Sequence, residues 1–254
     1  MKKHQLSLRV DFVRHLKGGL IHIGLADPDG HDLPEMLPGC FVEVAVDRAP
    51  VLLNRPFSIF NFTPRCLELL VKPLGRASAA LADYSEGDIL RVIAPLGRGF
   101  SQPEPGTKVM LVGGGVGIAP LYYQARAVKA AGATPVIVYG ERTAPDASLK
   151  AMLEKVAELH ICTDDGSEGF HGFVTAHPAV LAGDFSLMQV CGPAPMMAGM
   201  HRLACEHAWN AEFSLENKMA CGLGACLCCV EKTTTGNRCV CTDGPVFKKE
   251  ELPW

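Results

Sequence analysis

Six cysteines crowd into the last part of the chain, between Cys221 and Cys241. Three of them, Cys221, Cys226 and Cys229, have the spacing C-x4-C-x2-C, and Cys241 follows after eleven intervening residues. This is the spacing of a plant-type 2Fe–2S site, in which four thiolates complete the two iron tetrahedra. The loop between the first two cysteines holds two glycines, which let backbone N–H groups approach the sulfur atoms. The sequence therefore predicts a metal site at these four cysteines.

Two features leave this assignment open. Four thiolates also suit structural zinc, although zinc ribbons usually pair two C-x2-C knuckles and only one such spacing fits here. Cys228 adjoins Cys229, and Cys239 lies two residues before Cys241, so either could replace its neighbour as a ligand. The other five cysteines are scattered, and we interpret them as small buried side chains: Cys40, Cys66, Cys162, Cys191 and Cys205.

A glycine-rich turn in the middle of the chain could hold a dinucleotide. The predicted strand 109–112 is followed by this turn and then by the predicted helix 120–131. Backbone N–H groups in such a turn can meet a pyrophosphate at the helix N-terminus. The turn departs from G-x-G-x-x-G because position 118 is isoleucine, so a turn that is merely tight is the alternative. Its four glycines are Gly113, Gly114, Gly115 and Gly117.

A later predicted strand, 187–190, ends in Cys191, Gly192 and Pro193. Because the carboxyl ends of parallel strands meet at one edge of a sheet, this turn and the glycine-rich turn should face one crevice. That position places Cys191 near the nicotinamide ring as a hypothesis, with no certain catalytic residue. Acidic residues after other strand ends could bind ribose hydroxyls and favour NAD over NADP, or could be solvated loop residues: Glu141, Asp164 and Asp165.

Two segments in the first hundred residues could hold a diphosphate. One is Arg55-Pro56-Phe57-Ser58, at the start of a predicted strand, and the other is Gly75-Arg76-Ala77-Ser78, at the start of the short predicted helix 77–84. An arginine and a helix N-terminus are common partners of a diphosphate. Each has a structural alternative, because the arginine could pair with a carboxylate and the serine could cap the helix.

The chain predicts two kinds of scaffold for these residues. Its first hundred residues alternate apolar runs with turn signals, which predicts an antiparallel β-barrel with strands near 5–13, 20–26, 40–46, 56–62, 67–71 and 89–93. After the linker 101–106, strands and helices alternate, which predicts an α/β doubly wound sheet with a helix over 148–159. The last segment has no clear period. We expect domains at 1–102, 103–210 and 211–254.

Composition excludes some classes of protein. The net charge of −3 gives no electrostatic reason to expect nucleic acid or a membrane surface as a partner. The most apolar stretch, 109–123, is interrupted by four glycines and a proline, so it is too broken to span a bilayer. The first ten residues lack the apolar run of a signal peptide. Clustered cysteines without an export signal predict a metal site in a reducing, cytoplasmic location.

Taken in order, these motifs resemble the ferredoxin reductase superfamily. Within it, the chain is similar to the electron transfer subunits of NAD-dependent (class 1B) dihydroorotate dehydrogenases. The resemblance covers nearly the whole chain and is most specific at residues 219–226 and 241–247. It implies an FAD-binding barrel, an NAD-binding domain and a small C-terminal 2Fe–2S domain.

The resemblance also implies roles for individual residues. It places residues 55–58 against the flavin, and it assigns further contacts with the ring and the phosphates to Leu70, Val71, Lys72, Gly75, Arg76 and Ser78. The family often has a second glycine and a threonine where this chain has residues 75–78, so the phosphate contacts there are less well matched. The family's fourth cluster ligand precedes Asp-Gly-Pro, which favours Cys241 over Cys239.

By resemblance, an FMN-containing dihydroorotate dehydrogenase catalytic subunit oxidises dihydroorotate in pyrimidine (UMP) biosynthesis. Electrons then run through the 2Fe–2S cluster and FAD to NAD+, within a heterotetramer of two copies of each subunit. A flavin belongs between the others because it exchanges both single electrons and hydride. One alternative is a flavin and iron–sulfur subunit of an NAD(P)H:ferredoxin oxidoreductase or a hydrogenase. An alternative of another class is a non-enzymatic metal-binding or redox-sensing module.

Overall fold

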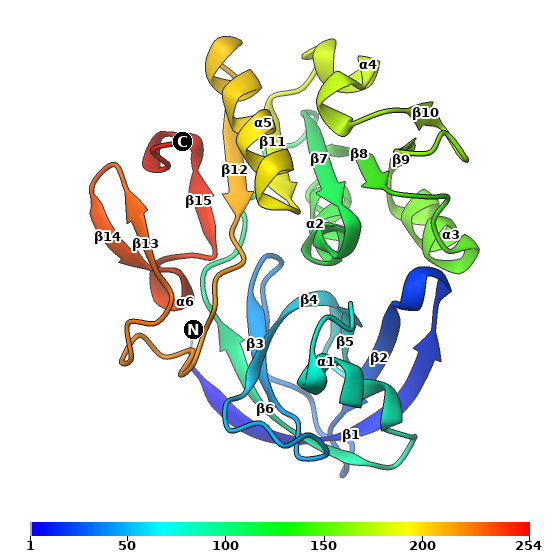
Figure 1. The fold of residues 1–254 in the computed structure, drawn as a ribbon, viewed down its shortest axis with the longest axis vertical. Helices are drawn as coiled ribbons and strands as arrows, with labels where there is room; N and C mark the ends of the chain where they lie inside the picture. The colour runs from blue at the N-terminus through cyan, green and yellow to red at the C-terminus, as the bar shows by residue number, and fades with distance from the viewer. Residues whose placement is uncertain (1) are drawn as a thin grey trace.

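The computed structural model describes residues 2–254, and its first part is a closed antiparallel barrel with strand order β1-β2-β5-β4-β3-β6 (Figure 1). The strands are β1 (His4–His15), β2 (Ile21–Ala26), β3 (Phe41–Ala45), β4 (Arg55–Thr63), β5 (Cys66–Val71) and β6 (Ile89–Leu96). The short helix α1 (Arg76–Ala80) lies between β5 and β6. The predicted barrel is confirmed.

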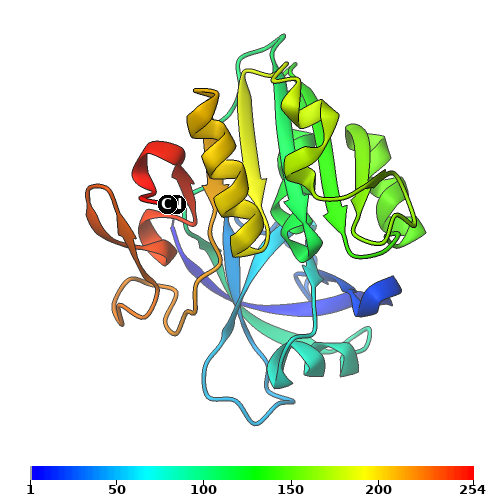
Figure 2. The ribbon, with the colours of Figure 1, turned by 45° about the horizontal axis from the view of Figure 1, so that its top comes forward.

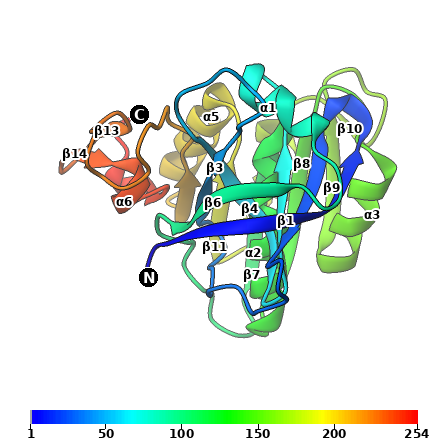
Figure 3. The same ribbon diagram turned by 90° about the horizontal axis from the view of Figure 1, so that it is seen from below.

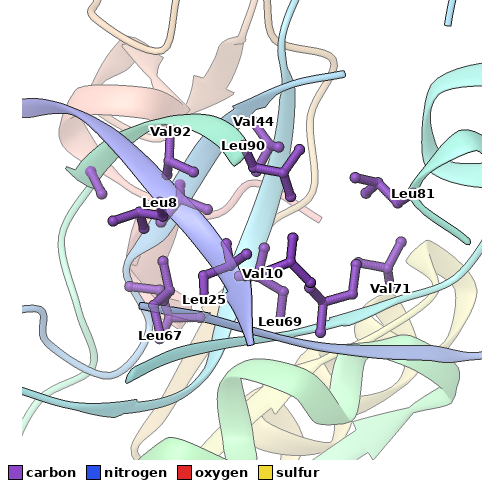
Figure 4. Close-up of a cluster of buried hydrophobic side chains, with 14 of the residues drawn as sticks. Leu8, Val10, Leu25, Val44, Leu67, Leu69, Val71, Leu81, Leu90 and Val92 are labelled. Atoms are coloured by element: carbon purple, nitrogen blue, oxygen red, sulfur yellow. The ribbon is translucent and has the colours of Figure 1, made fainter. Parts of the chain in front are cut away.

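Apolar side chains from every barrel strand fill its interior (Figure 4). Successive residues of a strand point to opposite faces. On β3, Val42 and Val44 belong to the barrel core, so Phe41 and Glu43 point outward. Both are nevertheless buried, and Phe41 belongs to a second core that includes residues of the C-terminal segment. Another part of the chain therefore covers the outer face of β3.

The second part is a seven-stranded sheet with order β10-β9-β8-β7-β11-β12-β15. All neighbours are parallel except the pair of β12 and β15. The strands are β7 (Lys108–Gly114), β8 (Thr134–Glu141), β9 (Glu158–Thr163), β10 (Phe170–His171), β11 (Leu187–Cys191), β12 (Ala211–Ser214) and β15 (Val246–Lys248). The predicted doubly wound sheet is confirmed.

Helices cover both faces of this sheet. Helices α2 (Ile118–Ala130) and α3 (Ala147–Val156) pack on one face, and α4 (Pro178–Leu181) and α5 (Ala194–Glu206) pack on the other. Figure 2 shows α5, in gold, across the near face. Among residues 2–254, no helix is both long enough and apolar enough to cross a membrane.

The C-terminal segment leaves this sheet and returns to it. After β12 come the hairpin β13 (Val230–Thr233) and β14 (Gly236–Cys239), the short helix α6 (Val240–Asp243), and then β15. Figures 1 and 3 show this segment beside barrel strands β3 and β6. Because β12 and β15 join the second sheet, the sheet continues past residue 210. The domain boundary expected there stays a prediction.

One predicted element is wrong at its end. The helix predicted over 148–159 stops at Val156, and Glu158 begins β9. The sequence of β9, ELHICT, mixes polar and apolar residues without the continuous apolar run of a buried strand. Its strand state comes from parallel pairing with β8, which local pattern does not reveal.

Polar and aromatic contacts join the barrel to α2. Phe60 stacks on Tyr122 with ring centroids 4.6 Å apart. Glu68 accepts a hydrogen bond from Asn61 Nδ2 at 2.7 Å, and its other carboxylate oxygen lies 2.6 Å from His22 Nε2. Asn61 in turn accepts a hydrogen bond from an arginine of α2, Arg126. The network holds the two parts of the chain in one orientation.

We expect Glu68→Ala to weaken this network. Burial alone raises the pKa of Glu68, but the hydrogen bonds from His22 and Asn61 outweigh it and hold that pKa below its ordinary value. Removing the carboxylate leaves both buried partners unpaired, so the free energy of unfolding should fall by about 2–3 kcal/mol in urea denaturation at pH 7.

The pH dependence gives a second check. A lowered carboxyl pKa contributes stability above the unfolded pKa, and this contribution is lost as the pH falls through the folded one. The difference in free energy of unfolding between wild type and Glu68→Ala should therefore become smaller in acid. A difference below about 0.5 kcal/mol at pH 7 would show that the network contributes little to stability.

Candidate functional site

A cavity of about 370 Å³ lies where the barrel, the α/β sheet and the C-terminal segment meet. A cavity of this size with largely apolar walls and a few polar groups fits a ring system with a polar tail. Of the residues predicted to bind the flavin, eight line it: Arg55, Pro56, Phe57, Ser58, Leu70, Val71, Lys72 and Ser78. Gly75 and Arg76 are exposed and do not line it.

The arginine and the serine of this wall are held by backbone groups. Arg55 Nη1 donates to the carbonyl oxygens of the two preceding residues, at 2.7 and 3.0 Å, which fixes the cation at the cavity without a carboxylate partner in the described chain. Ser78 Oγ accepts hydrogen bonds from the N–H groups of Leu74 and Gly75, at 3.0 and 3.1 Å. The serine therefore caps α1, the structural alternative that its sequence suggested.

The structure brings the two predicted nucleotide turns into contact. Cys191 pairs with Gly113 across β11 and β7. A Cβ atom added at Gly117 would lie 2.4 Å from the Cys191 carbonyl oxygen, and one added at Gly114 would lie 2.5 Å from Met196 Sδ. At Gly117 the close atoms belong to the backbone of Cys191 and Gly192, so only glycine fits there and the two turns pack directly on one another.

Cys191 itself is fully buried and does not line the cavity. Burial raises the pKa of its thiol well above the ordinary value, and a hydrogen bond with the Ser214 side chain only partly offsets this. At neutral pH the group is therefore a neutral thiol. It lies where the two turns meet, and its place next to the nicotinamide stays a hypothesis.

Sequence reasoning missed one wall of the cavity. This wall contains Phe41 on the outer face of β3, Pro245 after α6, and residues 215–219, which link β12 to the cysteine cluster. Among them is Glu216, which is exposed at the cavity although the protein packed around its carboxyl group raises its pKa by desolvation. Sequence position could have indicated this wall, because residues 215–219 follow the end of a strand and precede Cys221.

The cysteine cluster combines thiols with backbone donors. Cys221 Sγ accepts a hydrogen bond from Leu223 N at 3.3 Å, and Cys229 Sγ accepts one from Cys241 N at 3.4 Å. The first of these hydrogen bonds is the main cause that lowers the pKa of Cys221 to about 6. Burial, followed by the neighbouring Cys229, raises the pKa of Cys241 to about 12. Thiols with N–H groups aimed at sulfur fit an iron–sulfur cluster.

The structure also bears on the two substitute ligands. Cys239, like Cys241, lies close enough to Cys229 for their thiols to interact. Cys241 is buried, whereas Cys239 is half-buried and Cys228 is exposed. Geometry alone therefore keeps Cys239 as a rival to Cys241.

The cluster segment packs directly on the barrel beside the cavity. Arg98 N, just after β6, donates to the Gly244 carbonyl oxygen at 2.6 Å. A Cβ atom at Gly97 would lie 2.6 Å from Pro245 Cδ, so the two backbones touch. Since Pro245 also lines the cavity, one short stretch joins the cavity wall to the cysteine cluster.

Comparison with known proteins gives two family matches. A family model described as the iron–sulfur cluster binding domain of dihydroorotate dehydrogenase B matches residues 216–253, and one described as an oxidoreductase NAD-binding domain matches residues 111–202. The chain is 38% identical to the electron transfer subunit of dihydroorotate dehydrogenase B (NAD(+)) from Shouchella clausii, covering 85% of this chain and 86% of that protein. The subunit of the same name from Caldanaerobacter subterraneus is 36% identical, with the same coverage.

Solved structures agree on the architecture. A chain from the structure of an NADH-dependent reduced ferredoxin-NADP oxidoreductase is 30% identical with a TM-score of 0.83, covering 98% of this chain and 90% of that chain. Phthalate dioxygenase reductase matches with a TM-score of 0.65 and 24% identity, over 79% of this chain and 64% of that one. The second likeness concerns the fold alone.

The lowered pKa of Cys221 predicts selective reactivity. In reduced, cluster-free protein, we expect iodoacetamide to modify Cys221 with a pH midpoint near 6, because the Leu223 N–H group stabilises its thiolate. Mass spectrometry of tryptic peptides measures this, with Cys221→Ser as the control for assignment. A midpoint near the ordinary thiol pKa of about 8.5 would contradict the prediction.

Proposed function

The chain belongs to the family of electron transfer subunits of dihydroorotate dehydrogenase B (NAD(+)), and from this we propose that it carries electrons from dihydroorotate, oxidised on a partner subunit, to NAD+. It is an oxidoreductase subunit with FAD, a 2Fe–2S cluster and NAD as its cofactors. The observation that carries the proposal is the cavity whose walls come from the barrel, the nucleotide sheet and the cluster segment together.

Each part of the chain binds one cofactor in this proposal. FAD supplies the exchange between hydride and single electrons, and the cluster supplies one-electron transfer. Residues 55–58 and 70–72 hold the flavin, with Arg55 already fixed at the wall for a negative group. Cys221, Cys226, Cys229 and Cys241 hold the cluster. The turns at 113–117 and 191–193 hold NAD.

The end of β8 supports NAD rather than NADP. Tyr139 Oη donates a hydrogen bond to Glu141 Oε1 at 2.6 Å, so this carboxylate is fixed beside the carboxyl edge of the sheet. A fixed carboxylate there accepts hydrogen bonds from ribose hydroxyls and repels a 2′-phosphate. Asp165, by contrast, accepts a hydrogen bond from the backbone N–H of Ser167 within its own loop.

We propose that the partner docks over the cluster loop. Cys226 is exposed, and two large apolar side chains beside it, Leu223 and Leu227, are 46% and 62% exposed. Exposed leucines at a redox site fit a protein surface better than water. We propose an FMN-containing dihydroorotate dehydrogenase catalytic subunit as this partner, two copies of each chain in the complex, and the cytoplasm as its location.

A second candidate function has one observation in its favour. The reduced ferredoxin-NADP oxidoreductase chain matches nearly the whole length of this chain at 30% identity. A subunit that exchanges electrons between a nicotinamide nucleotide and ferredoxin would use the same cavity and cysteines. The two functions differ in the partner, which the assay below separates.

The direct test is anaerobic reduction of NAD+ by dihydroorotate, with this protein and the FMN-containing dihydroorotate dehydrogenase of the same organism. We expect activity only when both proteins are present, measured as NADH absorbance. Absence of activity from protein with intact FAD and cluster spectra, together with NADH-dependent ferredoxin reduction, would favour the second candidate.

Single cysteine variants test the ligand set. We expect Cys221→Ser, Cys226→Ser, Cys229→Ser and Cys241→Ser each to lose most of the visible cluster absorbance and bound iron, since each removes one thiolate. Cys228→Ser and Cys239→Ser are matched controls within the same segment and should keep both. Loss of iron in Cys239→Ser but not in Cys241→Ser would reverse the assignment of the fourth ligand.

A further inference from the structure

Glu43 is a buried carboxyl group without a hydrogen-bond partner. Its residue is 1% exposed, and both carboxylate oxygens are inaccessible and unpaired among residues 2–254. Burial of an unpaired carboxylate is strongly unfavourable, and an apolar side chain of similar size would avoid it. Packing alone therefore does not explain an acid at this position.

The side chain of Glu43 faces the cluster loop. It lies on the outer face of β3, opposite the core residues Val42 and Val44. A Cβ atom added at Gly222 would lie 2.8 Å from Glu43 Cγ and 3.3 Å from Glu43 Oε1. The backbone next to Cys221 is thus in contact with the carboxyl group. Gly222 also has a φ of 63°, which favours glycine for a second reason.

The cavity wall formed by residues 55–58, which we propose to hold the flavin, adjoins Glu43 on its other side. Glu43 pairs with Pro56 in the register of β3 and β4. Burial, followed by the neighbouring Cys221, raises the pKa of Glu43 to about 7, and the Arg55 guanidinium only partly opposes this rise. Leu96 on β6 is apolar and also lies next to the Gly222 position, 3.0 Å from a Cβ atom added there. Glu43 therefore lies between a residue that holds the flavin and the loop that holds the cluster.

We propose that Glu43 is a positioning residue for electron transfer, whose buried carboxylate beside the cluster loop lowers the reduction potential of the cluster. A negative charge on Glu43 disfavours an added electron on the nearby cluster, so the reduced cluster becomes a stronger donor. Arg55 offsets part of the cost of burying that charge, and Glu43 carries it at a pH above its pKa of about 7. This role rests on the proposed function, and it adds a residue that sets the reduction potential of the cluster.

The test is an anaerobic redox titration at pH 9, where Glu43 is ionised, of the full-length chain loaded with FAD and cluster, with dithionite as reductant and the cluster followed by EPR. We expect Glu43→Gln, which keeps the shape and removes the charge, to shift the cluster midpoint to a more positive potential. Glu68→Gln removes a barrel carboxylate that does not contact the cluster loop, and its midpoint should equal that of wild type. An unchanged midpoint in Glu43→Gln with full cluster content would overturn the proposal.

Thermal unfolding of the same variants separates this role from a structural one. Because the Glu43 carboxyl group makes no hydrogen bond and is costly to bury, we expect Glu43→Gln and Glu43→Leu to melt at the wild-type temperature or above it. Melting at a lower temperature, or loss of the cluster, would show that Glu43 supports the fold and would also overturn the proposal. The titration needs neither dihydroorotate nor a partner, so its result is independent of whether the proposed function fails.

Discussion

The arrangement of the site depends on close backbone packing between the barrel and the cluster segment. At two places this packing leaves no room for a side chain: Gly222 against Glu43 and Gly97 against Pro245. These contacts set the cysteine loop beside the cavity wall, because Glu43 pairs across β3 and β4 with Pro56, which lines the cavity. A larger residue at either glycine would push the cysteine cluster away from the barrel. The glycines therefore keep the cavity wall and the cysteine cluster in contact.

The α/β sheet anchors both ends of the cysteine-containing segment. The cysteines lie in an excursion between β12 and β15, which pair antiparallel with Phe213 opposite Phe247. Trp254 packs on Phe213 and His201, so the end of the chain docks on this protein's own sheet and α5. With both ends of the excursion held, the cluster loop presents Cys226 to the surface and Cys241 to the interior. One face thus meets solvent or a partner, while the other meets the barrel.

Sequence pattern predicted the elements that depend on local order and missed the contacts between distant segments. Alternation of apolar residues and turn signals sufficed for the six barrel strands, and cysteine spacing sufficed for the candidate cluster. The helix end at Val156 and the short strands β12 and β15 depend on pairing partners far along the chain, so no local pattern marks them. Glu43 was missed for the same reason, since an acid in an apolar strand becomes notable only when its surroundings are known. Gly75 and Arg76, expected at the flavin from resemblance, lie outside the cavity wall.

The central claim is that one chain contains the whole path between nicotinamide and cluster. Anaerobic stopped-flow mixing of the isolated, fully loaded chain with NADH tests it most directly, with reduction of the cluster followed by its visible absorbance. We predict that the cluster is reduced without any partner, in a first-order phase whose rate does not depend on protein concentration. A rate that rises with protein concentration, or reduction only after the partner is added, would contradict the claim.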